Sequence, residues 1–312
     1  MLHASGYEAC SVKPRYDLGS AEELADSLRE LRGFWKLWSA CLLSSCGLPT
    51  LAGIVVTRLY PAIREDLHRF LDEAGFTAAL VRHDKRLESP PHPRGGFLVP
   101  EELLQETIGF FLSLDRIVAV YEMADPLLNS HNMNLLFESE SEIWIEVVGP
   151  GFDASDLQRG DVSPHEAFSV QVPPGGTPAQ IKLIDRVDQE AYEDSVTSRK
   201  SKIKRKLDSS PEPGLARRIR ENLGIPDDLE AYLRRIDSPL CRLQAYQPIS
   251  ETLVMDTVRA VLRSGVIARY SDATGARFPL VFATSLVNRG TRQVYWDIVS
   301  PLLKFESLAR NP

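Results

Sequence analysis

Two cations and a pair of glycines stand at positions where they could hold phosphate groups. Lys36 follows Trp35 on the polar flank of an apolar helix, so its ammonium lies at the edge of a core, where loss of solvent strengthens its interactions. Arg82 ends a buried strand, and a guanidinium there can hold a phosphate through two hydrogen bonds. Arg94-Gly95-Gly96 precedes the strand-like Phe97-Leu98-Val99 and could cover a phosphate as a flap. The alternatives are a snorkelling lysine, an ion pair at Arg82 and a plain turn at the glycines.

Carboxylates gather in one loop, and another stands alone in the closing strand. The loop contains three aspartates, Asp153, Asp156 and Asp161. Carboxylates at these spacings could bind a hard cation, although Asp and Ser also favour hydrated turns. His165 and Glu166 follow in the same loop, and the histidine raises the possibility of a phosphohistidine. Asp297 lies within the apolar Tyr295-Trp296-Asp297-Ile298, where a buried carboxylate needs a partner or a metal.

Helices and strands around Lys36 and Arg82 follow from periodicity. Ser20 and Glu23 form a capping box that opens a helix. A single apolar stripe then runs along one helix face, through Leu24, Leu28, Leu31, Trp35, Trp38 and Leu42. Gly47-Leu48-Pro49 ends this helix. The pattern next predicts a strand over 54–57, a helix over 61–74 closed by a glycine, and a strand over 76–82 that carries Arg82.

The rest of the chain alternates between helices and strands in the same way. Residues 83–96 are polar and rich in Pro and Gly, which is typical of a loop, and Pro100 suits the first turn of a helix. Strands are expected at 116–122, 132–137 and 142–148, then a glycine- and aspartate-containing loop and a sharp turn at 173–176. Helices around 214–234 and 250–264 and strands at 277–284 and 292–299 follow. This order predicts an α+β or α/β fold.

Composition limits the classes of function. A chain of 312 residues forms one large domain or two ordinary ones. With 36 Lys and Arg against 43 Asp and Glu, the net charge is −7. Binding of nucleic acid through the overall charge of the protein is therefore not expected. Residues 189–212 are polar and contain the basic run 199–206, which we interpret as a solvated, mobile linker; docking on nucleic acid or an acidic partner is the alternative.

Sequence features also bear on the compartment. The four cysteines are too sparse for a disulfide framework, so buried thiols are expected. The 21 residues from Leu37 to Thr57 carry no charge and are long enough to cross a bilayer. Gly47-Leu48-Pro49 breaks any helix in the middle of this span, so no membrane association is expected. Since the N-terminus also lacks the pattern of a secretory signal, we expect a cytoplasmic protein.

Three segments in order resemble one enzyme family. Lys36 lies eleven residues before the segment Gly47-Leu-Pro-Thr-Leu-Ala-Gly-Ile-Val-Val-Thr57. Leu80-Val81-Arg82 is similar to a Val-Arg-Ser-Ser strand end, with His83 and Asp84 in place of the serines. The stretch 148–170 resembles a glycine-rich strand and loop followed by Gly-x-Val-x-Pro-Asp-x-Phe-x-Val. Together, over about residues 20–170, they resemble the ATP-grasp nucleotide-binding domain of phosphoenolpyruvate synthase and pyruvate phosphate dikinase.

The resemblance implies an ATP-grasp-like α+β fold whose two lobes close over ATP and Mg²⁺. The N-terminal lobe would span 1–120, and the C-terminal lobe 121–188 and 213–312, with the linker 189–212 between its parts. Lys36 and Arg82 would hold phosphates, with Gly95 and Gly96 covering them. Val118–Met123 resembles the strand that links the lobes, so Glu122 and Met123 would meet the base and ribose; an ordinary strand end is the alternative. Asp297 would bind the metal.

Several departures from the family pattern leave the activity open. The last two strands of the chain lack the family's Glu and its Gln-x-Arg, and the family keeps its phosphocarrier histidine in a separate domain for which this chain is too short. The first hypothesis is therefore a stand-alone ATP- and Mg²⁺-dependent phosphotransferase or ligase with an unidentified acceptor substrate. The second is a catalytically degenerate nucleotide-sensing or partner-binding module, for which a protein partner would supply missing domains. The third is a regulatory protein that docks through its basic loop.

Overall fold

The computed structural model describes residues 2–4, 7–12, 35–122, 129–198, 246–287 and 292–299. Within these ranges it leaves out 57, 60, 75–77, 86–95, 102–103, 115, 151, 153, 161, 174–177 and 179. The chain divides into two compact units. Unit 1 comprises Met1–Trp38, Leu51–Asp125 and Ser198–Ser238, and unit 2 comprises Ser39–Thr50, Pro126–Thr197 and Pro239–Pro312. One division falls inside helix α2 (Trp35–Ser45).

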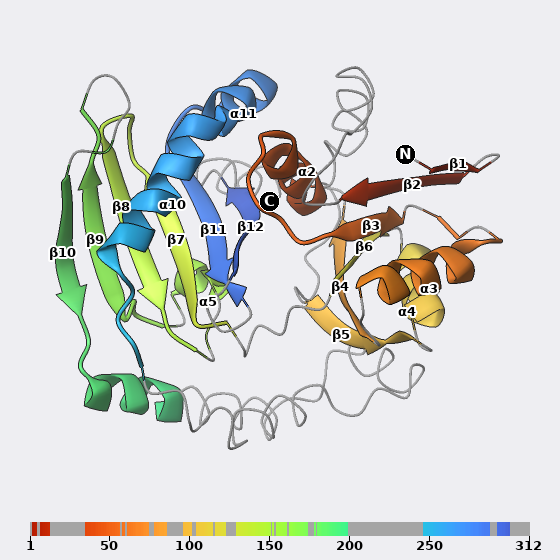
Figure 1. Ribbon diagram of the computed structural model, residues 1–312, viewed down its shortest axis with the longest axis horizontal. Helices are drawn as coiled ribbons and strands as arrows, with labels where there is room; N and C mark the ends of the chain where they lie inside the picture. Colours follow the sequence, from red (N-terminus) through yellow and green to blue (C-terminus); the bar gives the residue numbers. More distant parts are fainter. Residues whose placement is uncertain are drawn as a thin grey trace, which may run out of the picture. The chain divides into compact units, whose positions relative to one another are not determined.

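Unit 1 is built on a six-stranded antiparallel sheet in the order β1-β2-β3-β6-β4-β5 (Figure 1). Its strands are β1 (Leu2–Ala4), β2 (Tyr7–Val12), β3 (Gly53–Val56), β6 (Arg116–Tyr121), β4 (Ala78–Lys85) and β5 (Gly96–Pro100). Helices α3 (Ile63–Ala74) and α4 (Leu104–Ser113) bury their apolar stripes against one face of this sheet. The core between them contains Val81 and Val120 from the strands and Leu67 and Ile108 from the helices.

Unit 2 is built on a second six-stranded antiparallel sheet, in the order β10-β9-β8-β7-β11-β12. Its strands are β7 (His131–Phe137), β8 (Glu142–Val148), β9 (Glu166–Gln171), β10 (Gln180–Arg186), β11 (Leu280–Leu286) and β12 (Arg292–Val299). Its helices are α5 (Ala154–Arg159), α10 (Glu251–Ser264) and α11 (Val266–Thr274), and residues 189–198 are also helical.

Helices α5 and α10 lie on opposite faces of the sheet of unit 2. Asn134 on β7 donates to the carbonyl of Ala154 at the start of α5 over 2.9 Å. Tyr295 on β12 donates to the carbonyl of Thr257 on α10 over 3.2 Å. Side chains alternate between the two faces along a strand, whereas residues that pair across neighbouring strands share a face. Tyr295 pairs with Thr284 on β11, and Thr284 pairs with Met133 on β7. Tyr295 therefore shares a face with Met133, and Asn134, the next residue of β7, points to the other face. The two hydrogen bonds therefore leave from opposite faces, in agreement with Figure 1.

The α+β class is confirmed, and the periodic segments give the expected elements. The predicted helices at 61–74 and 250–264 correspond to α3 and α10, and the predicted strand at 142–148 is β8. The first part of the predicted helix from Ser20, the helix at 214–234 and the basic run lie outside the described residues. In the part of the chain that the structure describes, no helix is both long and apolar enough to cross a membrane.

Three sequence predictions differ from the structure. Strand β4 continues through His83 and Asp84 to Lys85, in place of the loop expected from residue 83, because it pairs with β6 as far as Lys85 opposite Arg116. The loop predicted after residue 148 contains α5 and β9. The segment 189–212, expected to be mobile throughout, begins with the helix over 189–198.

Candidate functional site

Strand β4 of unit 1 presents different chemistry on its two faces. Val81 belongs to the core under α3 and α4, and the ring of His83 stacks on Phe111 of α4 at a centroid distance of 4.2 Å. Because side chains alternate along a strand, Arg82 and Asp84 point to the other face of the sheet. Arg82 is half-buried and Asp84 is buried there. The face away from α3 and α4 therefore carries a cation and a carboxylate two residues apart.

The carboxylate of Asp84 brings the start of helix α2 to this face. Its Oδ2 accepts the backbone N–H of Lys36 over 2.6 Å and that of Leu37 over 3.3 Å. The first N–H groups of a helix have no partner within the helix, and an anion at this end also interacts favourably with the helix dipole. Asp84 thus caps α2 across 48 residues of sequence. Lys36, half-buried, stands in the first turn that this cap holds.

Lys36 and Arg82 are in this way brought to one face of one unit. The Cα atoms of Arg82 and Asp84 are roughly 7 Å apart along the strand, and Asp84 contacts the backbone of Lys36 directly. Two long cationic side chains that start this close can reach neighbouring oxygens of one phosphate chain. Gly96 on β5 pairs with Arg82, so the glycine also belongs to this neighbourhood, whereas Gly95 lies outside the described residues.

A buried arginine lies under the same strand end. Arg116, at the start of β6, is 4% exposed and places its Nη1 3.4 Å from Nδ1 of His83. Burial lowers the pKa of Arg116, and the charge of Asp84 acts in the opposite direction. The charge of Asp84 therefore acts on Arg116 in addition to capping α2.

Glu122, predicted to contact the base or ribose, is tied to the backbone of Ala52. Its Oε1 accepts the N–H of Ala52 over 3.0 Å, and its own N–H donates to the carbonyl of Ala52 over 2.8 Å. This reciprocal pair extends the β3–β6 ladder beyond Gly53 and Tyr121. The chain passes from unit 1 to unit 2 between Asp125 and Pro126, so Glu122 stands shortly before that passage. Met123 lies outside the described residues.

Asp297, the predicted metal ligand, is half-buried on β12 of unit 2. It lies opposite Ala283 on β11, and Ala283 lies opposite Asn134 on β7. The described residues contain no group of three or more His, Cys, Asp or Glu side chains that could hold a metal ion. Of the predicted loop carboxylates, Asp153 and Asp161 lie outside the described residues, and Asp156 is part of α5.

The environment of His165 explains the role of this residue in unit 2. Its Nδ1 accepts the N–H of Gly149 over 3.0 Å, which places the ring proton on Nε2, 3.0 Å from Oγ of Ser195. The ring is 1% exposed and meets Tyr192 and Tyr246 edge-on. Burial, with a smaller effect of the charge of His131, lowers the pKa of His165 to about 4. Both nitrogens are used in packing the unit, which argues against a phosphohistidine.

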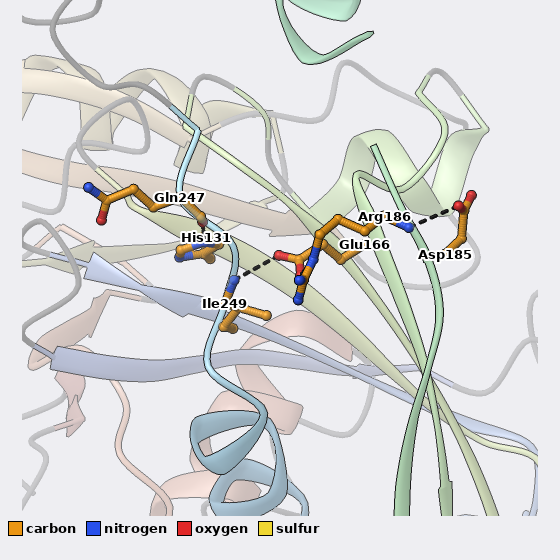
Figure 2. A network of polar contacts seen from close by, with 6 residues as sticks. All are labelled: His131, Glu166, Asp185, Arg186, Gln247 and Ile249. Carbon is orange, nitrogen blue, oxygen red and sulfur yellow. Dashed lines mark hydrogen bonds and ion pairs between the residues drawn. The ribbon is translucent and has the colours of Figure 1, made fainter. Parts of the chain in front are cut away.

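Glu166, the other polar residue of that loop, forms the centre of a buried network (Figure 2). Its side chain is fully buried and accepts from Nε of Arg186 and from the backbone N–H of Ile249, each over 2.8 Å. Nε2 of His131 donates to the carbonyl of Gln247 over 2.7 Å in the same region. The network fastens the segment before α10 to strands β7, β9 and β10, so we assign Glu166 to the structure of unit 2.

Asp84 is the site residue that sequence reasoning missed. A signal was present, because Arg82 and Asp84 are two residues apart and a strand that continued past Arg82 would place both on one face. The composition of 83–96 favoured a loop, and nothing local revealed that α2 would supply N–H donors to the carboxylate.

Comparisons with known proteins give distant structural similarities. No protein-family model matches the chain, and no curated protein matches it. D-cycloserine synthetase DcsG is 14% identical, with a TM-score of 0.28, over 57% of this chain and 80% of that one. The D-alanine-D-alanine ligase from Coxiella burnetii is 13% identical, with a TM-score of 0.27, over 72% and 70%. The macrocyclase MdnC from Microcystis aeruginosa MRC, bound with precursor peptide MdnA, is 12% identical, with a TM-score of 0.26, over 51% and 62%.

None of these three structures is a phosphoenolpyruvate synthase or a pyruvate phosphate dikinase. The narrower resemblance in the sequence therefore remains a prediction.

Proposed function

We propose that the chain is an ATP-binding protein of the ATP-grasp type and acts as an ATP-dependent ligase or phosphotransferase. The observation that carries the proposal is the placement of Lys36 and Arg82 on the face of the unit 1 sheet away from α3 and α4, linked through Asp84. Both cations would hold phosphate oxygens of ATP. Glu122 and Met123, shortly before the chain leaves unit 1, would meet the ribose and the base.

Magnesium fits the proposal less well than ATP does. Asp297 remains the proposed ligand, and Mg²⁺ would supply charge neutralisation at the phosphates when bound. The described residues contain no group of three or more His, Cys, Asp or Glu side chains that could hold the ion, so we assign the ion no step in the reaction. The acceptor would be a separate substrate, and a protein partner would supply the further domains that the resemblance implies.

A thermal-shift experiment tests the nucleotide proposal. ATP with Mg²⁺ should raise the melting temperature of the wild-type protein, and Lys36→Ala and Arg82→Ala should each reduce this rise. Arg69→Ala is the matched control, because Arg69 is an exposed cation on α3, on the other side of the same sheet. If millimolar ATP leaves the melting temperature of the wild type unchanged, the nucleotide proposal is wrong.

Product analysis separates the classes of activity. ADP would indicate a ligase or a simple kinase, whereas AMP would indicate a dikinase-like path. ATP binding with no product would support the second candidate, a degenerate nucleotide-sensing module. One observation favours that candidate: β11 carries no carboxylate, and Asp297 is the one acidic residue on β12. The cytoplasmic location remains a prediction.

A further inference from the structure

Asp84 joins two elements of unit 1 that each carry a proposed phosphate ligand. The residue is 7% exposed on β4, and its Oδ2 accepts two consecutive N–H groups, those of Lys36 and Leu37. Hydrogen bonds from backbone N–H groups to an ionised carboxylate are short and strong, and the 2.6 Å bond from Lys36 agrees with this. The carboxylate therefore holds the first turn of α2 to β4.

The same strand fixes where Arg82 stands relative to that turn. Arg82 pairs with Ala119 on β6 and Gly96 on β5, so hydrogen-bonded neighbours on both sides hold its backbone. Lys36 lies instead in the second position of helix α2, where its backbone N–H donates to Asp84. Its place relative to Arg82 depends on the cap, because uncapped helix ends fray within the first turn.

We propose that Asp84 is a positioning residue, which sets the first turn of α2 so that the ammonium of Lys36 and the guanidinium of Arg82 reach the same phosphate chain. This inference rests on the proposed nucleotide function and assigns to Asp84 no contact with the nucleotide. A carboxylate beside two proposed phosphate-binding cations would repel a polyphosphate and so weaken its binding. The positioning role explains why Asp84 nevertheless stands there.

A purely structural role for Asp84 is the competing explanation, since its charge also acts on the buried Arg116. The two roles differ in their coupling to Lys36. If Asp84 acts on nucleotide binding through Lys36, removing the cap should matter only while the ammonium is present. If Asp84 merely supports the fold of unit 1, its effect on affinity should be the same with and without that ammonium.

A double-mutant cycle on ATP affinity distinguishes these outcomes. Affinities of the wild type, Asp84→Ala, Lys36→Ala and the double variant are measured by calorimetry with ATP and Mg²⁺, and urea unfolding without nucleotide confirms that each variant is folded. Alanine is used at position 84 because an asparagine oxygen would still accept the two N–H groups. We expect Asp84→Ala to weaken binding about tenfold in the wild-type background and less than about twofold in the Lys36→Ala background. Asp72→Ala, which replaces an exposed carboxylate on α3, is the matched control and should leave affinity unchanged.

Each result decides a different statement. Equal losses in the two backgrounds, or no loss in Asp84→Ala, would overturn the positioning role while leaving the nucleotide proposal intact. A wild-type protein that does not bind ATP would overturn both. Should Asp84→Ala fail to fold, amide hydrogen exchange of the wild type replaces it: the amides of Lys36 and Leu37 should be protected, and ATP should increase this protection. Rapid exchange of both amides, or protection that ATP does not change, would overturn the inference.

Discussion

Glu166 and Arg186 lie directly opposite each other on β9 and β10, and Nε of Arg186 is 2.8 Å from Oε2 of Glu166. The carboxylate is fully buried, whereas the guanidinium is about one-third exposed. The other oxygen of Glu166 accepts the N–H of Ile249. A buried charge that loses its partner is far more costly than a neutral group in the same place. The pair therefore makes the stability of unit 2 depend on Arg186.

Arg186→Ala should lower the free energy of unfolding by about 3 kcal/mol, because it removes the charged partner of the buried carboxylate. Adding Glu166→Gln should recover part of this loss, since the amide oxygen still accepts from Ile249 without a charge. Urea unfolding of the three proteins measures the effect. Arg259→Ala, at an exposed ion pair on α10, is the control and should change stability by less than about 1 kcal/mol. A double variant less stable than Arg186→Ala would contradict the explanation.

Gly53 at the start of β3 is required by a close approach of Tyr121. A Cβ at this position would lie 2.6 Å from Cδ1 of Tyr121 and 2.9 Å from the carbonyl oxygen of Val120. Gly53→Ala should therefore destabilise unit 1 by about 1–3 kcal/mol through overpacking. Gly109→Ala, inside helix α4, is the contrasting variant. Outside the backbone of the helix, the atom nearest to a Cβ at this position would be Cδ1 of Leu59, at 3.4 Å, which is an ordinary contact.

Gly109→Ala should leave stability unchanged or raise it by up to about 1 kcal/mol, because alanine is the better helix former. Thermal unfolding of the two variants measures both effects. Equal changes in the two variants would show that the contact between Gly53 and Tyr121 is not what limits the residue at position 53.

His165 should make the stability of unit 2 depend on pH. Its pKa is about 4 in the folded protein, against an ordinary value of 6.5, because the ring is buried. The unfolded chain therefore binds more protons between these values, so this contribution to stability is complete above about 6.5 and is lost as the pH falls toward 4. At its steepest the loss amounts to about 1.4 kcal/mol per pH unit.

Urea unfolding between pH of about 7 and about 4.5 checks this prediction. His165→Gln should be less stable than the wild type at neutral pH and should show a shallower dependence in that range. Burial also lowers the pKa of His131, so part of the dependence should remain. An unchanged slope in His165→Gln would assign the whole effect to other groups.

Periodic segments were predictable because their signals are local. The apolar stripe of 61–74 and the alternation of 142–148 specify α3 and β8 without knowledge of their neighbours. Strands β9 and β10 escaped prediction. Glu166 begins β9 with a buried charge, and the edge strand β10 is exposed along much of its length. Such strands form because neighbouring strands and the partner Arg186 satisfy their polar groups.

The sequence by itself predicted an α+β or α/β fold, which the family resemblance narrowed to α+β, and it named Lys36 and Arg82 as phosphate-binding candidates. It also determined the break at Gly47-Leu48-Pro49, after α2 has ended, so that residues 37–57 do not form one helix. Only the tertiary structure decided that Asp84 belongs to a strand and caps α2, and that His165 and Glu166 serve packing. The reason is one of range. Helix and strand periods repeat within a few residues, whereas the hydrogen bond between Lys36 and Asp84 joins groups 48 residues apart and exists only when the chain is folded.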